Sequence, residues 1–274
     1  MSQKKFIDVR GLIKSKNPKL LKWIPWFVIG YLRKILHEDE INQFIVDNGH
    51  LYDDEFCQAI VEYFSINIEI NGVENIPKTG PVIIALNHPL GGMDAVAFIA
   101  ALKNHRKDFK FIVNDLLMNL ENLKNLFVGV NKHGKNAPSV RQQIRNIFIS
   151  DNMVCVFPAG LVSRKIKGEI TDLVWKKTFV QYAKELNHPV VPVFIDGQLS
   201  NFFYRLSKFR RFIGIKANIE MLYLADELFK QRGKTIKFNI GKPVDVRKSC
   251  DNLSDIETSE WFRNHVHKLN KIEK

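Results

Sequence analysis

The stretch PVIIALNHPLGGMDAVAFIAAL, residues 81–102, decides the fold of this chain. It opens with an apolar run typical of a buried strand and closes with an apolar run typical of a buried helix. Between the two runs, His88 follows the strand, Gly91 and Gly92 allow a tight loop, and Asp94 stands where the helix begins. This order predicts an imidazole beside a carboxylate, which is how a general base is oriented.

From residue 66 onward, short apolar runs alternate with helical patterns. The predicted strands are residues 66–70, 81–86, 109–113, 127–130, 153–157, 189–195 and 235–240. The predicted helices are residues 94–104, 115–123, 138–149, 172–186, 200–212 and 255–271. The alternation predicts an α/β fold with a mixed, largely parallel central sheet flanked by helices. Pro192 lies inside one apolar run, which predicts an edge or distorted strand there.

Residues 1–65 are predicted to form an N-terminal helical segment, and residues 66–274 a second domain. The aromatic residues Trp23, Trp26, Phe27 and Tyr31 are flanked by lysine and arginine. Aromatic rings at headgroup depth with cations beside them are typical of an anchor at an anionic membrane surface. The alternative is a helix packed on the sheet. A second stretch that interleaves aromatic and basic residues follows at 205–212.

The charge of the chain indicates an anionic partner. Lys and Arg number 41 against 29 Asp and Glu, a formal net charge of +12. Nucleic acid, anionic lipid and an acidic carrier protein are all compatible with that surplus. The 3 cysteines are far apart, and neither a secretion signal nor a spanning apolar segment is visible, so we expect a protein of the reducing cytoplasm.

Two further loops follow predicted strands and carry polar or conformationally unusual residues. The first is Asn131-Lys132, after residues 127–130. The second is Phe157-Pro158-Ala159-Gly160 with Ser163 and Arg164, after residues 153–157. Ligands of parallel sheets bind beyond the carboxyl ends of the strands, so we expect the second of these loops to face one crevice with His88, whereas the first is a weak pattern on its own. The cations there are suited to a phosphate or carboxylate, and a solvated basic turn is the alternative.

These loops and the Val-Pro run around Pro192, in this order, resemble the four sequence blocks of the glycerolipid acyltransferases, the family of the bacterial lysophosphatidate acyltransferases. The resemblance covers roughly residues 66–243. Five residues separate His88 from Asp94 where the family usually has four, and Ala159 stands where the family usually has glutamate. Both departures resemble the hemolysin-like branch, which includes O-acyltransferases that complete ornithine and glycine lipids.

The resemblance implies that His88 is the general base and that Asp94 orients its imidazole. The acceptor would be the hydroxyl of an amino-acid-headed lyso-lipid, and the donor an acyl thioester of acyl carrier protein or coenzyme A. The enzyme would work as a peripheral protein at the cytoplasmic face of an anionic membrane. It implies substrate contacts by Asn87, Gly91, Gly92, Asn131, Lys132, Phe157, Pro158, Ala159, Gly160, Ser163 and Arg164. Metal-ligand spacings and nucleotide-phosphate loops are missing from the sequence, so no metal and no cofactor are expected.

Other function classes remain as alternatives. A lysophosphatidate or lysophospholipid acyltransferase would use the same blocks, and a non-catalytic lipid-binding or acyl-carrier-binding protein could share the fold. A nucleic-acid-binding module would suit the charge, but no sequence signature of such a module is present, so no nucleic-acid partner is expected. A serine hydrolase would need a G-x-S-x-G elbow, which the chain lacks.

Overall fold

The computed structural model of the protein describes residues 5–130 and 138–271. Their contacts divide them into two compact units. The smaller unit combines the chain up to Leu51 with Leu199–Gln231, and the larger one combines Tyr52–Gln198 with the chain from Arg232 onward. These two units do not coincide with the predicted segments 1–65 and 66–274. The predicted boundary, between a helical segment and a second domain with its own function, stays a prediction.

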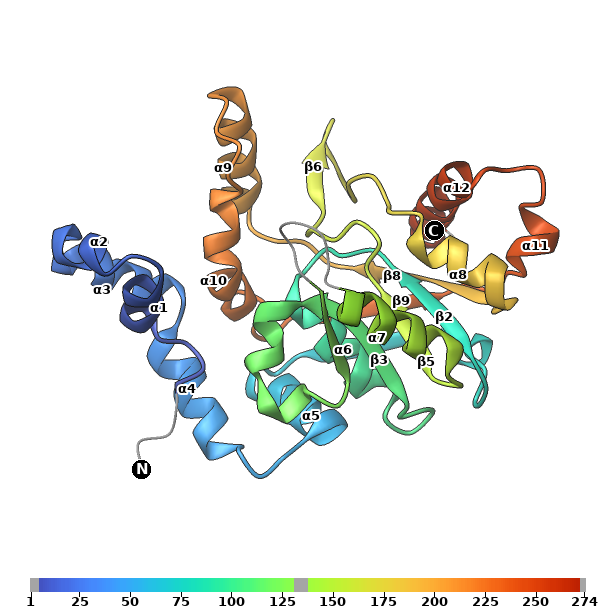
Figure 1. The fold of residues 1–274 in the computed structure, drawn as a ribbon, viewed down its shortest axis with the longest axis horizontal. Coiled ribbons are helices and arrows are strands. Elements are labelled where there is room, and N and C mark those ends of the chain that lie inside the picture. Colours follow the sequence, from blue (N-terminus) through green and yellow to red (C-terminus); the bar gives the residue numbers. More distant parts are fainter. Residues whose placement is uncertain (1–4, 131–137, 272–274) are drawn as a thin grey trace. The chain divides into compact units, whose positions relative to one another are not determined.

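The larger unit is built on a seven-stranded sheet with the strand order β1-β9-β8-β2-β5-β3-β4 (Figure 1). Its strands are β1 (Asn67–Asn71), β2 (Val82–Leu86), β3 (Phe109–Asn114), β4 (Phe127–Val130), β5 (Met153–Val156), β8 (Val190–Asp196) and β9 (Thr235–Ile240). Neighbouring strands are parallel except for the antiparallel pair β8–β9. The predicted mixed, largely parallel sheet is confirmed, and each predicted strand is found to within one residue at either end.

Helices cover both faces of this sheet. They are α5 (Asp53–Tyr63), α6 (Gly92–Leu102), α7 (Pro138–Ile149), α8 (Thr178–Leu186), α11 (Val246–Ser249) and α12 (Asp255–Lys268). Ile83 and Ala85 of β2 share a core cluster with residues of α7, α8 and α12. The ring of Phe98 on α6 instead meets Phe111 and Phe238 of the sheet. Because β2 is covered on both faces, all its residues are buried, which explains its unbroken apolar sequence.

Of the two alternatives predicted from Pro192, an edge strand is wrong, because β8 lies inside the sheet between β9 and β2. The Pro192 carbonyl accepts a hydrogen bond of 2.9 Å from the N–H of Gly241, just after β9 ends. A residue with an N–H at position 192 would direct that N–H toward Gly241 as well. There the pairing with the chain after β9 changes register, since Val190 next pairs with Val244 through an isolated bridge. The missing N–H therefore falls in an irregular part of the ladder, where proline is tolerated.

Two predicted helices differ from the structure. Residues 115–123 form two 3₁₀ turns, Asp115–Asn119 and Glu121–Leu123, because Leu120 between them has an extended backbone. Helix α8 begins at Thr178, so the first residues of the predicted helix at 172–186 are irregular.

A short hairpin that the sequence pattern did not predict precedes α8. Its strands are β6 (Arg164–Ile166) and β7 (Glu169–Thr171), and it stands out from the larger unit in Figure 1. Its turn residues, Lys167 and Gly168, both have positive φ, as two-residue hairpin loops require.

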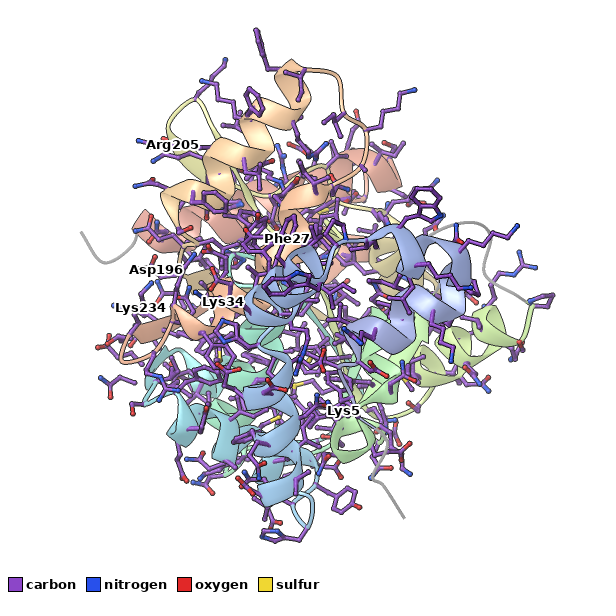
Figure 2. The ribbon with its side chains drawn as sticks, turned by 90° about the vertical axis from the view of Figure 1, so that its left-hand side faces the viewer. Lys5, Phe27, Lys34, Asp196, Arg205 and Lys234 are labelled. Carbon is purple, nitrogen blue, oxygen red and sulfur yellow. The ribbon has the colours of Figure 1, made fainter. Side chains whose placement is uncertain are left out.

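The smaller unit is helical. It contains α1 (Val9–Lys16), α2 (Pro18–Trp23), α3 (Trp26–Ile35), α4 (Glu38–Asp47), α9 (Asn201–Phe212) and α10 (Leu224–Phe229). Trp23 and Trp26 are 84% and 81% exposed on either side of Pro25. Figure 2 shows the side chains of this unit, among them the exposed Phe27 and Arg205. Within the described residues, every helix is too short or too polar to cross a membrane.

Candidate active site

The centre of the candidate site is a hydrogen bond between His88 and Asp94. Strand β2 ends at Leu86, and His88 follows it in the loop that leads to α6. Asp94 lies in the first turn of α6, and its Oδ2 is 2.8 Å from the Nδ1 of His88. Gly91 has φ +73, a conformation that favours glycine, and this turn accommodates the extra residue between the two. The structure thus brings the predicted pair together.

The geometry fixes which imidazole nitrogen is free to react. The N–H of Leu90 also donates to Asp94 Oδ2, at 3.0 Å, and the Asp94 side chain is fully buried. Because Asp94 is an acceptor for His88 Nδ1–H, the tautomer with a bare Nε2 is favoured. The His88 side chain keeps 18% of its surface exposed, so a substrate hydroxyl can approach it. Burial raises the pKa of the Asp94 carboxyl above its ordinary value, and the hydrogen bond from His88 opposes that rise.

The Phe157–Gly160 turn lies directly against the imidazole. Strand β5 is the parallel neighbour of β2, so its carboxyl end emerges beside His88. The Phe157 ring stacks on the His88 ring with centroids 4.2 Å apart. The Gly160 N–H closes the turn by donating to the Phe157 carbonyl at 2.9 Å, and Gly160 has φ +65. Pro158 and Ala159 are buried in the turn. The expected meeting of these two loops at one edge of the sheet is therefore observed.

Three of the predicted substrate contacts have protein partners. Asn87 is buried, and its side-chain amide both donates to the Ile195 carbonyl (2.9 Å) and accepts from the Ile195 N–H (2.6 Å). It therefore ties the end of β2 to β8. Arg164 is also buried, and its guanidinium donates to the Val162 carbonyl. Ser163 is buried as well, and its hydroxyl donates to Asp172. Substrate binding by these residues stays a prediction.

The remaining predicted contacts differ in position. Gly91 is buried in the loop, whereas Gly92 is exposed at the start of α6. Their main-chain N–H groups are candidates for binding an oxyanion, whereas the Gly160 N–H already donates to the Phe157 carbonyl. Asn131 and Lys132 lie outside the residues that the structure describes.

Asp172 is a residue of the site that the sequence analysis missed. It is completely buried, and its Oδ1 accepts from the main-chain N–H of His88 (3.2 Å) and from the Ser163 hydroxyl (2.5 Å). Its Oδ2 accepts from the Trp175 indole N–H at 2.8 Å. The Ser163 N–H in turn donates to the His88 carbonyl at 2.7 Å. Both main-chain polar groups of His88 are therefore held by the segment that follows the Phe157–Gly160 turn.

The sequence held one weak signal for this arrangement. An aspartate and a tryptophan three residues apart precede α8, within the range 172–186 that was predicted to be helical. Among the described residues, no group of three or more His, Cys, Asp or Glu side chains is arranged to hold a metal ion.

A family model described as "Acyltransferase" matches residues 11–272. The chain belongs to this acyltransferase family. It is 42% identical over 264 residues to a lyso-glycine lipid O-acyltransferase of Bacteroides thetaiotaomicron, covering 96% of this chain and 97% of the relative. It is 41% identical to the lyso-glycine lipid O-acyltransferase of Phocaeicola vulgatus, covering 96% and 95%.

Solved structures are also similar to this chain. One of them is PlsC, the 1-acyl-sn-glycerophosphate acyltransferase of Thermotoga maritima, which matches 90% of both chains at 19% identity with a TM-score of 0.49. The family match confirms the prediction that the chain is an acyltransferase. The two relatives confirm its predicted likeness to the branch that includes glycine lipid O-acyltransferases.

Proposed function

We propose that this protein transfers a fatty acyl chain from an acyl thioester to the hydroxyl of a lyso-lipid with a glycine head group. The observation that carries the proposal is the His88–Asp94 pair, in a chain that is 42% identical to a lyso-glycine lipid O-acyltransferase over nearly its whole length. The pair has the geometry of a base with its orienting carboxylate, and Ser163, which contacts the His88 main chain, donates its hydroxyl to Asp172.

The reaction then uses the substrate's own hydroxyl as the nucleophile. His88 Nε2 takes the hydroxyl proton while the oxygen attacks the thioester carbonyl carbon. Main-chain N–H groups at Gly91 or Gly92 bind the oxyanion that forms. Collapse of this intermediate restores the carbonyl, now that of an ester, and breaks the carbon–sulfur bond, and the leaving thiolate takes the proton from His88. Asp94 stabilises the imidazolium between these two proton transfers. The balance is one ester and one thiol, and it needs no metal or cofactor.

The acyl donor of the proposal is acyl carrier protein, with acyl coenzyme A as the alternative. The net charge of +12 favours a strongly acidic partner. Coenzyme A is also anionic through its phosphates, so the charge supports both donors and the choice rests on a direct comparison of their kcat/KM values.

The proposed place of work is an anionic membrane surface on the cytoplasmic side, where the protein is peripheral. Exposed aromatic residues and cations on the smaller unit support it. The side chains of Trp23, Trp26 and Phe212 are mostly exposed, with Lys22 and Arg211 beside them. Exposed aromatic rings of this kind are costly in water and favourable at headgroup depth.

A test of the function is acyl transfer by the purified protein. Lyso-glycine lipid, lyso-ornithine lipid and lysophosphatidate are each offered with acyl carrier protein thioester and with acyl coenzyme A. Diacylated glycine lipid is the expected product, and His88→Ala lowers its rate by about 10²–10⁴, the contribution of a general base. Turnover with lysophosphatidate alone would overturn the proposal in favour of phospholipid synthesis. Lipid binding without turnover, unchanged in His88→Ala, would indicate a non-catalytic binding protein.

A further inference from the structure

Lys176 is held against the Phe157–Gly160 turn by its main chain. Its N–H donates to the carbonyl of Pro158 at 3.0 Å. The residue before it, Trp175, is buried and its indole donates to Asp172, so the backbone has little freedom here. The root of the Lys176 side chain is therefore fixed relative to the turn whose Phe157 stacks on His88.

The ammonium group of Lys176 lies over Gly160. A Cβ built on Gly160 would be 3.4 Å from the Lys176 Nζ and 3.7 Å from its Cε. A Cβ at this position would make ordinary van der Waals contact with the ammonium, and the φ of +65° at Gly160 favours glycine. The turn therefore leaves the space next to this cation open at a point that is three residues from the stacking partner of the base.

The charge of Lys176 is not neutralised by the part of the chain that the structure describes. No carboxylate in residues 5–130 or 138–271 forms an ion pair with it, and its side chain is exposed. With Gly160 beneath it and no ion-pair partner among the described residues, the ammonium keeps its charge for a ligand.

We propose that Lys176 binds the carboxylate of the acceptor's glycine head group while His88 faces the acceptor's hydroxyl. The inference rests on the proposed function. Glycine that is acylated on its nitrogen keeps one free carboxylate, and an ammonium group binds such an anion as a point charge with its hydrogen-bond donors. A lyso-lipid held at both places presents its hydroxyl to the base, which makes Lys176 a specificity-determining residue for acidic acceptors.

The test compares Lys176→Ala with Lys177→Ala, which removes the adjacent exposed lysine. Lys176→Ala is expected to raise the KM for lyso-glycine lipid about tenfold, the size of a partly exposed charge-assisted hydrogen bond, with a smaller change in kcat and in the KM for the donor. Lys177→Ala is expected to behave as wild type. The methyl ester of the same lyso-lipid should show the same rise in KM with wild type, and no further rise with Lys176→Ala. Lys176→Arg is expected to restore most of the affinity.

Several results would overturn this inference. Equal acceptor KM values in the two alanine variants would exclude a role of Lys176, and a shift confined to the donor KM would assign the cation to an anion of the donor. Thermal unfolding of both variants shows whether either is misfolded, and Lys176→Gln, which removes the charge but keeps most of the side chain, then replaces a misfolded Lys176→Ala. If wild type acylates only lysophosphatidate, the proposed function fails, and a raised KM for that substrate in Lys176→Ala would show a phosphate ligand instead of the carboxylate.

Discussion

At the scale of single residues, the site depends on a buried carboxylate that is costly to keep ionised. Asp94 is fully buried, and burial raises the pKa of its carboxyl above the ordinary value. A folded-state pKa above the unfolded one means that the folded protein holds its proton more tightly. Stability is then lost as the pH rises from the ordinary pKa through the raised one. Asp94 thus orients His88 at the expense of stability at neutral pH.

Asp94→Asn is expected to separate these two effects. Its amide keeps the shape of the carboxyl group but favours the wrong imidazole tautomer, so the rate should fall by about 10²–10⁴. Its stability should lack the decline with rising pH, so the melting temperature of the variant relative to wild type should increase from acidic to neutral buffer. Activity assays and thermal unfolding across that pH range measure both. A difference in melting temperature that shrinks toward neutral pH would contradict this account.

At the scale of elements, the segment from Ser163 to Lys176 assembles the site from neighbouring strand ends. Asp172 accepts from the His88 main chain, from Ser163 and from Trp175, and thereby fixes the loop after β2 against the chain after β5. No other side chain of this shape can accept all three of these hydrogen bonds. An amide in its place must point its NH₂ group either at the indole N–H or at the main-chain N–H of His88.

Asp172→Asn is therefore expected to lower the free energy of unfolding by about 1–3 kcal/mol, the cost of leaving a buried polar group unpaired. Trp175→Phe removes one of the two opposed donors, so the double variant should recover part of that loss. A double-mutant cycle from denaturant unfolding measures the coupling, and the kcat values of the same four proteins show whether His88 is displaced. Additive losses in the cycle would mean that Asp172 and Trp175 act independently.

The element scale also shows how far the sequence pattern reaches. Every strand of the seven-stranded sheet was predictable, because buried parallel strands are short apolar runs between turn residues. Pro192 predicted an edge or a distorted strand and could not decide between them, because the place of a strand in the sheet depends on partners that are remote in sequence. The irregular stretch before α8 was wrongly predicted as helix, because its hydrogen bonds go to Pro158, His88 and Ser163 and not to its own backbone.

At the scale of the whole molecule, the basic charge and the exposed aromatic residues of the smaller unit predict binding to anionic membranes. Trp23 and Trp26 are the two tryptophans with the largest exposed fractions. The protein should co-sediment with vesicles that contain anionic lipid, and it should do so less as the salt concentration rises.

Replacing both Trp23 and Trp26 by serine should weaken vesicle binding roughly tenfold or more, since each loses apolar burial at the interface. The matched control is Ile256→Ser, which removes an exposed apolar side chain from α12 of the larger unit. Co-sedimentation of the three proteins with the same vesicles is the measurement. Wild-type binding by the double variant would rule out this membrane anchor.

The sheet, the helix α6 and the pairing of His88 with Asp94 could all be predicted from the sequence. These features are encoded locally, as apolar periodicity and as a strand-loop-helix only a few residues long. The tertiary structure decided which remote residues surround that pair: Phe157 on the imidazole, Asp172 on its main chain, and Lys176 over Gly160. They come from loops that only the order of strands in the sheet brings together, because burial and hydrogen bonding between distant segments leave no periodic trace in the sequence.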